Sequence, residues 1–77
     1  MNKDRRMQLS EVSDTIQDAI DQIQEVIDDE QDAFDNMPEG IQESSRGDKM
    51  QEYIDRMEDL INDLENCDNT LQDIVND

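Results

Sequence analysis

Apolar residues recur three and four positions apart along two long segments of the chain, which is the spacing of one face of a helix. When Leu9 is assigned to position a of a seven-residue repeat abcdefg, 22 of the 25 apolar residues fall at positions a, d or e. Such a stripe is wider than a coiled-coil seam and is typical of a helix in a bundle. The pattern predicts an all-α protein with one helix over about residues 4–37 and another over about residues 47–76.

The stripe is interrupted by Glu30 at position a of the first segment and by Asp68 at position e of the second. We expect Glu30 to lie near an edge or to pair with a basic group such as Lys49 or Arg56. Cys67 lies at position d, and no base stands near it in the sequence to activate its thiol. We therefore expect Cys67 to be a small buried apolar residue and not a nucleophile.

Residues 38–46 form the predicted connection between the helices. Pro38 ends the first helix because proline lacks an N–H and disfavours helical backbone in the preceding residue. Ser45, followed three residues later by Asp48, resembles a capping box at the start of the second helix. Ile41 is the only apolar residue in the connection, and we expect it to seat the loop on the end of the bundle.

Two helices with one apolar stripe each leave the open side of the stripe unburied, which in a chain of 77 residues favours oligomerisation. We therefore expect a single domain, an antiparallel helical hairpin that dimerises into a homodimeric four-helix bundle. The residues expected in the core of this oligomer are Ile16, Ile20, Ile23, Ile27, Phe34, Ile54, Met57, Ile61, Leu64 and Leu71.

The charge balance narrows the classes of partner. The chain has 23 Asp or Glu residues against 6 Lys or Arg, a formal charge of -17. Direct binding to nucleic acid or to an anionic membrane surface is thereby disfavoured, and a partner with a basic surface is favoured. No window has the 18 or so apolar residues of a membrane span. The first six residues carry positive charge without a following apolar run, so we expect no secretory signal and a cytoplasmic location.

Candidate chemistry is sparse. The chain has no His and one Cys, which excludes histidine catalysis, His-ligated metal and an internal disulfide. Residues 35–40 superficially resemble the start of an EF-hand loop, but Met37 stands third, Pro38 interrupts it and Arg46 stands twelfth. No phosphate-binding glycine loop or serine nucleophile motif is present. We expect no enzyme activity, no cofactor and no specific metal site.

A row of carboxylates lies opposite the apolar stripe of the first helix, at positions c and f. Residues 8–45 contain twelve acidic residues and no basic one, although like charges at this spacing destabilise a helix by about 0.2–0.5 kcal/mol per pair. One helix is sparser in charge than a DNA strand, so mimicry of a duplex requires several helices side by side. The candidate partner-binding residues are Glu11, Asp14, Asp18, Asp21, Glu25, Asp28, Asp32 and Asp35, with Glu39 and Glu43 in the connection.

The connection and its flanks resemble a pattern in small acidic proteins of bacteriophages and other mobile elements. The residues that carry the resemblance are 29–31, 34–40, 42–44 and 46–47. The resemblance implies a phage or mobile-element origin, a bacterial host and a helical hairpin, and it implies no function. The wider class of small acidic phage proteins includes DNA mimics that inhibit restriction enzymes, CRISPR nucleases and uracil-DNA glycosylase, and this chain is similar to them in size, charge and implied origin.

The first functional hypothesis is that the chain inhibits a nucleic-acid-binding host protein, of the DNA-processing or defence type, by occupying its basic groove with the acidic face. The alternative is a structural or interaction module, a homo- or hetero-oligomeric helical bundle whose charge serves solubility. On that alternative, polar substitutions at exposed e positions such as Ile27 or Ile61 would abolish binding. A third possibility is a hairpin that is largely disordered alone and folds on a basic partner.

Overall fold

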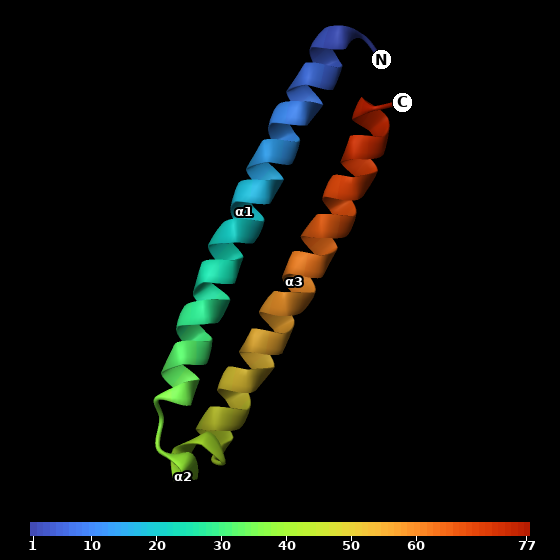
Figure 1. The fold of residues 1–77 in the computed structure, drawn as a ribbon. Coiled ribbons are helices and arrows are strands. Elements are labelled where there is room, and N and C mark those ends of the chain that lie inside the picture. Colours follow the sequence, from blue (N-terminus) through green and yellow to red (C-terminus); the bar gives the residue numbers. More distant parts are fainter.

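The computed structural model describes residues 1–77 and contains three helices and no strand. Helix α1 covers Lys3–Asp35, the single-turn helix α2 covers Glu39–Gln42, and helix α3 covers Ser45–Val75. The long helices lie side by side in opposite directions, so both termini are at one end and α2 is at the other (Figure 1). The Cα atoms span 58 × 15 × 12 Å, which makes the molecule a rod. The all-α prediction is confirmed, and each long helix ends within two residues of its predicted bounds.

The interior between α1 and α3 is built from position e of both helices. Its buried hydrophobic residues are Ile20 and Ile27 of α1 and Ile54 and Ile61 of α3. The hydrogen bond between Ser13 and Asp68, also at position e, fixes the alignment of the helices, so that residues whose numbers sum to 81 lie at one level along the rod. The half-buried residues that pack against this interior occupy position a: Ile16, Ile23, Met57 and Leu64.

Position d is exposed along most of both helices. A helix turns about 100° per residue, so position e lies about 40° from a, whereas d lies about 100° from e. When e points at the neighbouring helix, a lies at the edge of the contact and d faces away from it. The large hydrophobic residues at d are 44–52% exposed: Val12, Val26, Tyr53, Leu60 and Ile74. The apolar stripe is therefore divided between the interior of the hairpin and an open face.

The connection differs from the prediction in two places. Ile41 is 39% exposed and does not seat the loop; the amide of Gln42 does so instead, with Nε2 donating to the Phe34 carbonyl oxygen at 2.8 Å. The N-cap of α3 is Ser44 and not Ser45, and no side chain caps the helix. The Ser44 hydroxyl donates to the Ile41 carbonyl oxygen, so it is not available to the first turn of α3.

Gly47 is the glycine that the fold requires. It lies at position e in the first turn of α3 and is buried against α2. A Cβ atom built on Gly47 would lie 2.0 Å from the Gln42 carbonyl oxygen, so a larger residue would force the backbone of α2 away. The absence of a side chain therefore allows the connection to fold back tightly on α3.

The open end of the hairpin is held by Arg6, whose Nη1 donates to the backbone carbonyl oxygens of Val75 and Asp77. Beside it, Asn2 caps α1, since its Oδ1 accepts a hydrogen bond from the Arg5 N–H at 2.9 Å. These contacts order the basic start of the chain against the end of α3. The two ends of the sequence are therefore linked within one chain.

Candidate interaction surfaces

The acidic face of α1 is fully presented to solvent. All ten predicted partner-binding carboxylates are exposed, including Glu39 and Glu43 beside α2. The one salt bridge of the molecule joins Lys49 to Glu52 on α3, at 3.2 Å, and leaves this face unpaired. A surface ion pair of that kind contributes about 0–1 kcal/mol. The carboxylates of α1 are thus available to a partner and are not engaged in holding the hairpin together.

Three glutamines occupy places on α1 where lysine would neutralise a carboxylate. Each of these three donates its side-chain amide to an aspartate one turn away. The pairs are Gln22 to Asp18 at 3.4 Å, Gln24 to Asp28 at 3.1 Å and Gln31 to Asp35 at 2.9 Å. An amide is neutral, so these hydrogen bonds order the carboxylates and leave their charge in place.

The two long helices together carry charge at a density close to that of DNA. Residues 11–35 of α1 and the opposing residues 46–70 of α3 include eighteen carboxylates and three basic side chains, a net charge of -15. At 1.5 Å per residue the segment is about 36 Å long, which gives one negative charge per about 2.4 Å. Duplex DNA carries one per about 1.7 Å of axis. The hairpin alone therefore reaches about 70% of duplex density.

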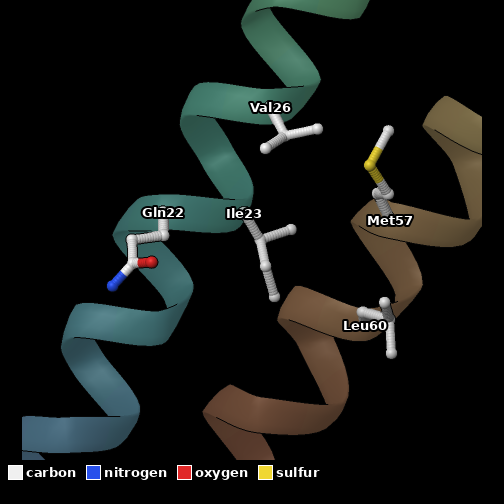
Figure 2. A pocket seen from close by; sticks show the side chains of 5 residues that line it. All are labelled: Gln22, Ile23, Val26, Met57 and Leu60. Carbon is white, nitrogen blue, oxygen red and sulfur yellow. The ribbon is translucent and has the colours of Figure 1, made fainter.

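The second surface is the open apolar face, formed by positions a and d of both long helices. A shallow groove runs along it, and Figure 2 shows Ile23 and Val26 of α1 on the side of that helix that faces Met57 and Leu60 of α3. The groove is lined by Gln22, Ile23, Val26, Met57 and Leu60. Four of these five residues are hydrophobic, so the groove has few groups that could orient a polar ligand. It is suited to an apolar helix surface.

The predicted exposure of several residues is wrong, because position d and not position e lies on the open apolar face. Cys67 is exposed and not buried, because position d lies on the open face. Ile27 and Ile61, expected to be exposed at position e, are only 5% and 8% exposed because they form the interior of the hairpin. Polar substitutions at these two positions would unfold the hairpin and would not test a surface. The exposed residues suited to that test are at d, such as Val26 and Leu60.

The predicted oligomer core is largely the core of the hairpin itself. Of its ten residues, four are buried between α1 and α3, and the remaining six are half-buried: Ile16, Ile23, Phe34, Met57, Leu64 and Leu71. The position-a residues among these six reach the open apolar face as well as the interior, because a lies between d and e. One chain therefore buries four residues of the set and leaves the other six half-buried.

A polar cluster joins the helices toward the terminal end of the rod. It consists of the buried residues Ser13 and Asp68, the half-buried Gln72 and the exposed Gln17. The Ser13 hydroxyl donates to Asp68 Oδ1 at 2.6 Å, and Gln17 Nε2 donates to Asp68 Oδ2 at 2.7 Å. Gln72 Nε2 donates in turn to Ser13 Oγ at 2.6 Å. Ser13 and Asp68 are 4% and 6% exposed, and no buried side-chain polar atom lacks a partner. The cluster is complete, so it serves the alignment of the helices.

Glu30 was predicted to lie near an edge or to pair with Lys49 or Arg56. Glu30 is half-buried near the loop end, and neither Lys49 nor Arg56 forms a salt bridge with it. The Lys49 ammonium group instead bonds to Glu52 and lies 5.3 Å from the centre of the Tyr53 ring. The predicted ion pair of Glu30 with Lys49 or Arg56 is thus not formed within one chain. Glu30 lies instead at the edge of the contact between the helices.

No group of three or more Cys, Asp or Glu side chains is arranged to hold a metal ion. Neither long helix contains a stretch long and apolar enough to cross a membrane. Comparison with protein-family models, with curated proteins and with solved structures gave no significant match. The candidate functional features are therefore the acidic face and the open apolar face.

Proposed function

We propose that this chain is a binding protein that inhibits a nucleic-acid-binding protein by presenting the acidic face of α1 to its basic groove. The observation that supports the proposal is the exposure of all ten candidate carboxylates on a segment with no basic residue. The setting we propose is the cytoplasm of a bacterial cell, in which a phage or mobile element would use the chain against a DNA-processing or defence protein.

The length of the acidic row also supports this proposal. The row covers residues 11–35 and is about 36 Å long, which is close to the 34–36 Å of one turn of duplex DNA. A basic groove that extends over one turn of duplex along the axis would therefore meet carboxylates over the same length. Complementary charge of this kind gives fast association that weakens steeply as salt is added.

The test is capture of bacterial proteins on the tagged chain at low salt, followed by elution with high salt or with a duplex oligonucleotide. A nucleic-acid-binding protein that is eluted by both would be the expected target. The variant that replaces Asp14, Asp21, Asp28 and Asp35 with Asn should lose this capture while its helicity is retained. Unchanged capture by that variant would reject the role of the acidic face.

A matched control separates the acidic face from bulk charge. Replacing Asp55, Asp59, Asp63 and Asp73 of α3 with Asn removes the same four charges from exposed positions on the other helix. This control variant should keep most of the capture if α1 makes the contact. Equal losses in the two variants would mean that net charge, and not the row on α1, governs binding.

The second candidate function is an interaction module that works through the open apolar face, with the homodimeric four-helix bundle as its simplest form. The observation that favours it is the exposure of five large hydrophobic residues at position d of both helices. On this proposal the variant with four Asn residues on α1 would keep its binding partner. Replacing Val26 and Leu60 with Gln would abolish the assembly without disturbing the buried interior.

A further inference from the structure

We infer that the open apolar face binds a second copy of this chain in one defined orientation, with α1 of each copy packed on α3 of the other and both connections at the same end. The inference develops the homodimer named above, and it does not depend on whether the acidic face has a target. Three observations carry it: the surface area of the single chain, the symmetry available to two hairpins, and the charges along the rim of the apolar face.

The single chain exposes more surface than its mass predicts. A compact monomer of 9.0 kDa has an accessible surface of about 4,900 Å². The hairpin exposes 5663 Å², an excess of about 800 Å². Each partner in a standard protein interface buries about 800 Å². One further copy seated on the apolar face would therefore bring the chain to the burial expected of a compact protein.

Two copies that meet face to face can be related in two ways. The twofold axis lies in the interface, either along the rod or across it. An axis along the rod places α1 on α3 of the second copy and both connections at one end. An axis across the rod places α1 on α1, α3 on α3, and the connections at opposite ends. The charges at position g, on the outer rim beside d, differ between the two arrangements.

When the twofold axis runs along the rod, a residue of α1 and a residue of α3 from the second copy also lie at one level if their numbers sum to 81. Asp29 of α1 lies at the level of residue 52 of the second copy, between Lys49 and Arg56, which are about 5 and 6 Å away along the axis. All three side chains are exposed in the single hairpin and lie at position g. Asp63, the remaining acidic residue on this rim, lies beside Thr15 and Gln22. Every charged neighbour across the rim is thus of opposite sign.

With the axis across the rod and the ends of the rods aligned, Asp29 loses this match, and Arg56 instead lies at the level of Asp63 of the second copy. In that alignment Asp29 lies near Gln8 and Thr15 of the second copy, which are neutral. The two α1 helices, each with ten carboxylates and no basic residue over residues 11–35, also become direct neighbours. In the first arrangement they lie diagonally across the bundle, separated by the α3 helices, which carry the basic residues. Electrostatic repulsion therefore selects the arrangement with both connections at one end.

Disulfide formation between copies distinguishes the two arrangements, because Cys67 is exposed at position d. In a Val12→Cys variant the new thiol faces Cys67 of the second copy, about 3 Å away along the axis, when α1 packs on α3. In a Tyr53→Cys variant the new thiol faces Cys67 of the second copy only when α3 packs on α3. The wild-type chain, oxidised under the same conditions, measures the background of random collision.

We expect the Val12→Cys variant to form a covalent dimer on mild oxidation, at least tenfold faster than the Tyr53→Cys variant or the wild type. Sedimentation equilibrium should give twice the chain mass for all three before oxidation. Faster coupling in Tyr53→Cys would overturn the orientation. A chain mass of 9.0 kDa at micromolar concentration would overturn the dimer, while leaving capture of a basic target by the acidic face as a separate result.

A charge exchange provides a second test that uses no cysteine. Replacing Asp29 with Lys should weaken the dimer about tenfold, because it places like charges beside Lys49 and Arg56 of the second copy. Adding Lys49→Glu and Arg56→Glu should restore the affinity. An unchanged dissociation constant in the Asp29→Lys variant, with helicity retained, would reject the proposed rim contacts.

Discussion

The polar cluster around Asp68 gives a quantitative test of how α1 and α3 are held together. Asp68 is 6% exposed and accepts two short hydrogen bonds, from Ser13 and Gln17. A hydrogen bond to a charged group contributes about 1.5–3 kcal/mol. Replacing Asp68 with Ala removes both bonds and also removes a buried charge, whose desolvation offsets part of the loss. We expect the free energy of unfolding to fall by about 2–3 kcal/mol.

Replacing Ser13 with Ala should cost a similar amount, about 1.5–3 kcal/mol, because the carboxylate of Asp68 then keeps only Gln17 as a partner. The double variant should cost less than the two single losses together, since neither group is then left unpaired. We expect a coupling energy of about 1–2 kcal/mol. Urea unfolding, followed by helicity at one fixed protein concentration and at pH 7, measures all four free energies.

A conservative control checks the cause of the loss. In Asp68→Asn, the amide oxygen can accept from Ser13, and its N–H₂ can donate to Gln17 once the Gln17 amide turns over. This variant should therefore lose less than half as much stability as Asp68→Ala. The reasoning would be refuted if the losses of the two single alanine variants summed to the loss of the double variant within about 0.5 kcal/mol. It would also be refuted if either single alanine variant were more stable than the wild type.

Three further predictions concern the interior, the connection and the charge. Replacing Ile54, 3% exposed at the centre of the buried cluster, with Ala should lower the free energy of unfolding by about 2–5 kcal/mol, measured by urea unfolding. Gly47→Ala should lower the melting temperature because of its contact with the Gln42 carbonyl oxygen, whereas Gly40→Ala, with open space around it, should not. Raising ionic strength from 0.05 to 0.5 M should raise the melting temperature of a chain with a charge of -17, and a fall would contradict the expected self-repulsion.

The helices were predictable because one signal, the three-and-four spacing of apolar residues, runs through almost the whole chain. The division of the stripe was not predictable from the spacing alone. Positions d and e are both apolar, and the sequence does not say which of them faces the other helix of the same chain. The structure assigns e to the interior and d to the open face, and for that reason Cys67 and Ile27 lie opposite to expectation.

The polar cluster could have been predicted from the sequence, because two polar residues stand at positions of the repeat that are otherwise apolar. Ser13 occupies position e in a helix whose next three e positions are Ile20, Ile27 and Phe34, and Asp68 is the polar exception among the e positions of α3. An antiparallel hairpin brings these two exceptions to one level, as its isoleucine pairs show. Two polar residues at matching levels predict a buried pair. The connection offered no such rule, because the N-cap serine of α3 is one residue earlier than expected and its hydroxyl bonds to the connection instead of the helix.

The position of this cluster has a consequence for how the chain finds its fold. A seven-residue repeat allows two helices to slide by one full repeat and still match apolar positions, so a hairpin built only from isoleucine layers has competing alignments. Sliding by one repeat would place Asp68 against Ile20 or Arg6 and Ser13 against Ile61 or Val75. Facing Ile20, the carboxylate would be buried without a hydrogen-bond donor, at a cost of several kcal/mol. Facing Arg6, the carboxylate would keep a partner, but the Ser13 hydroxyl would then be buried against Ile61 without one. A single polar layer, set toward one end of the rod, therefore disfavours both alternative alignments, and most strongly the one that buries the carboxylate against Ile20.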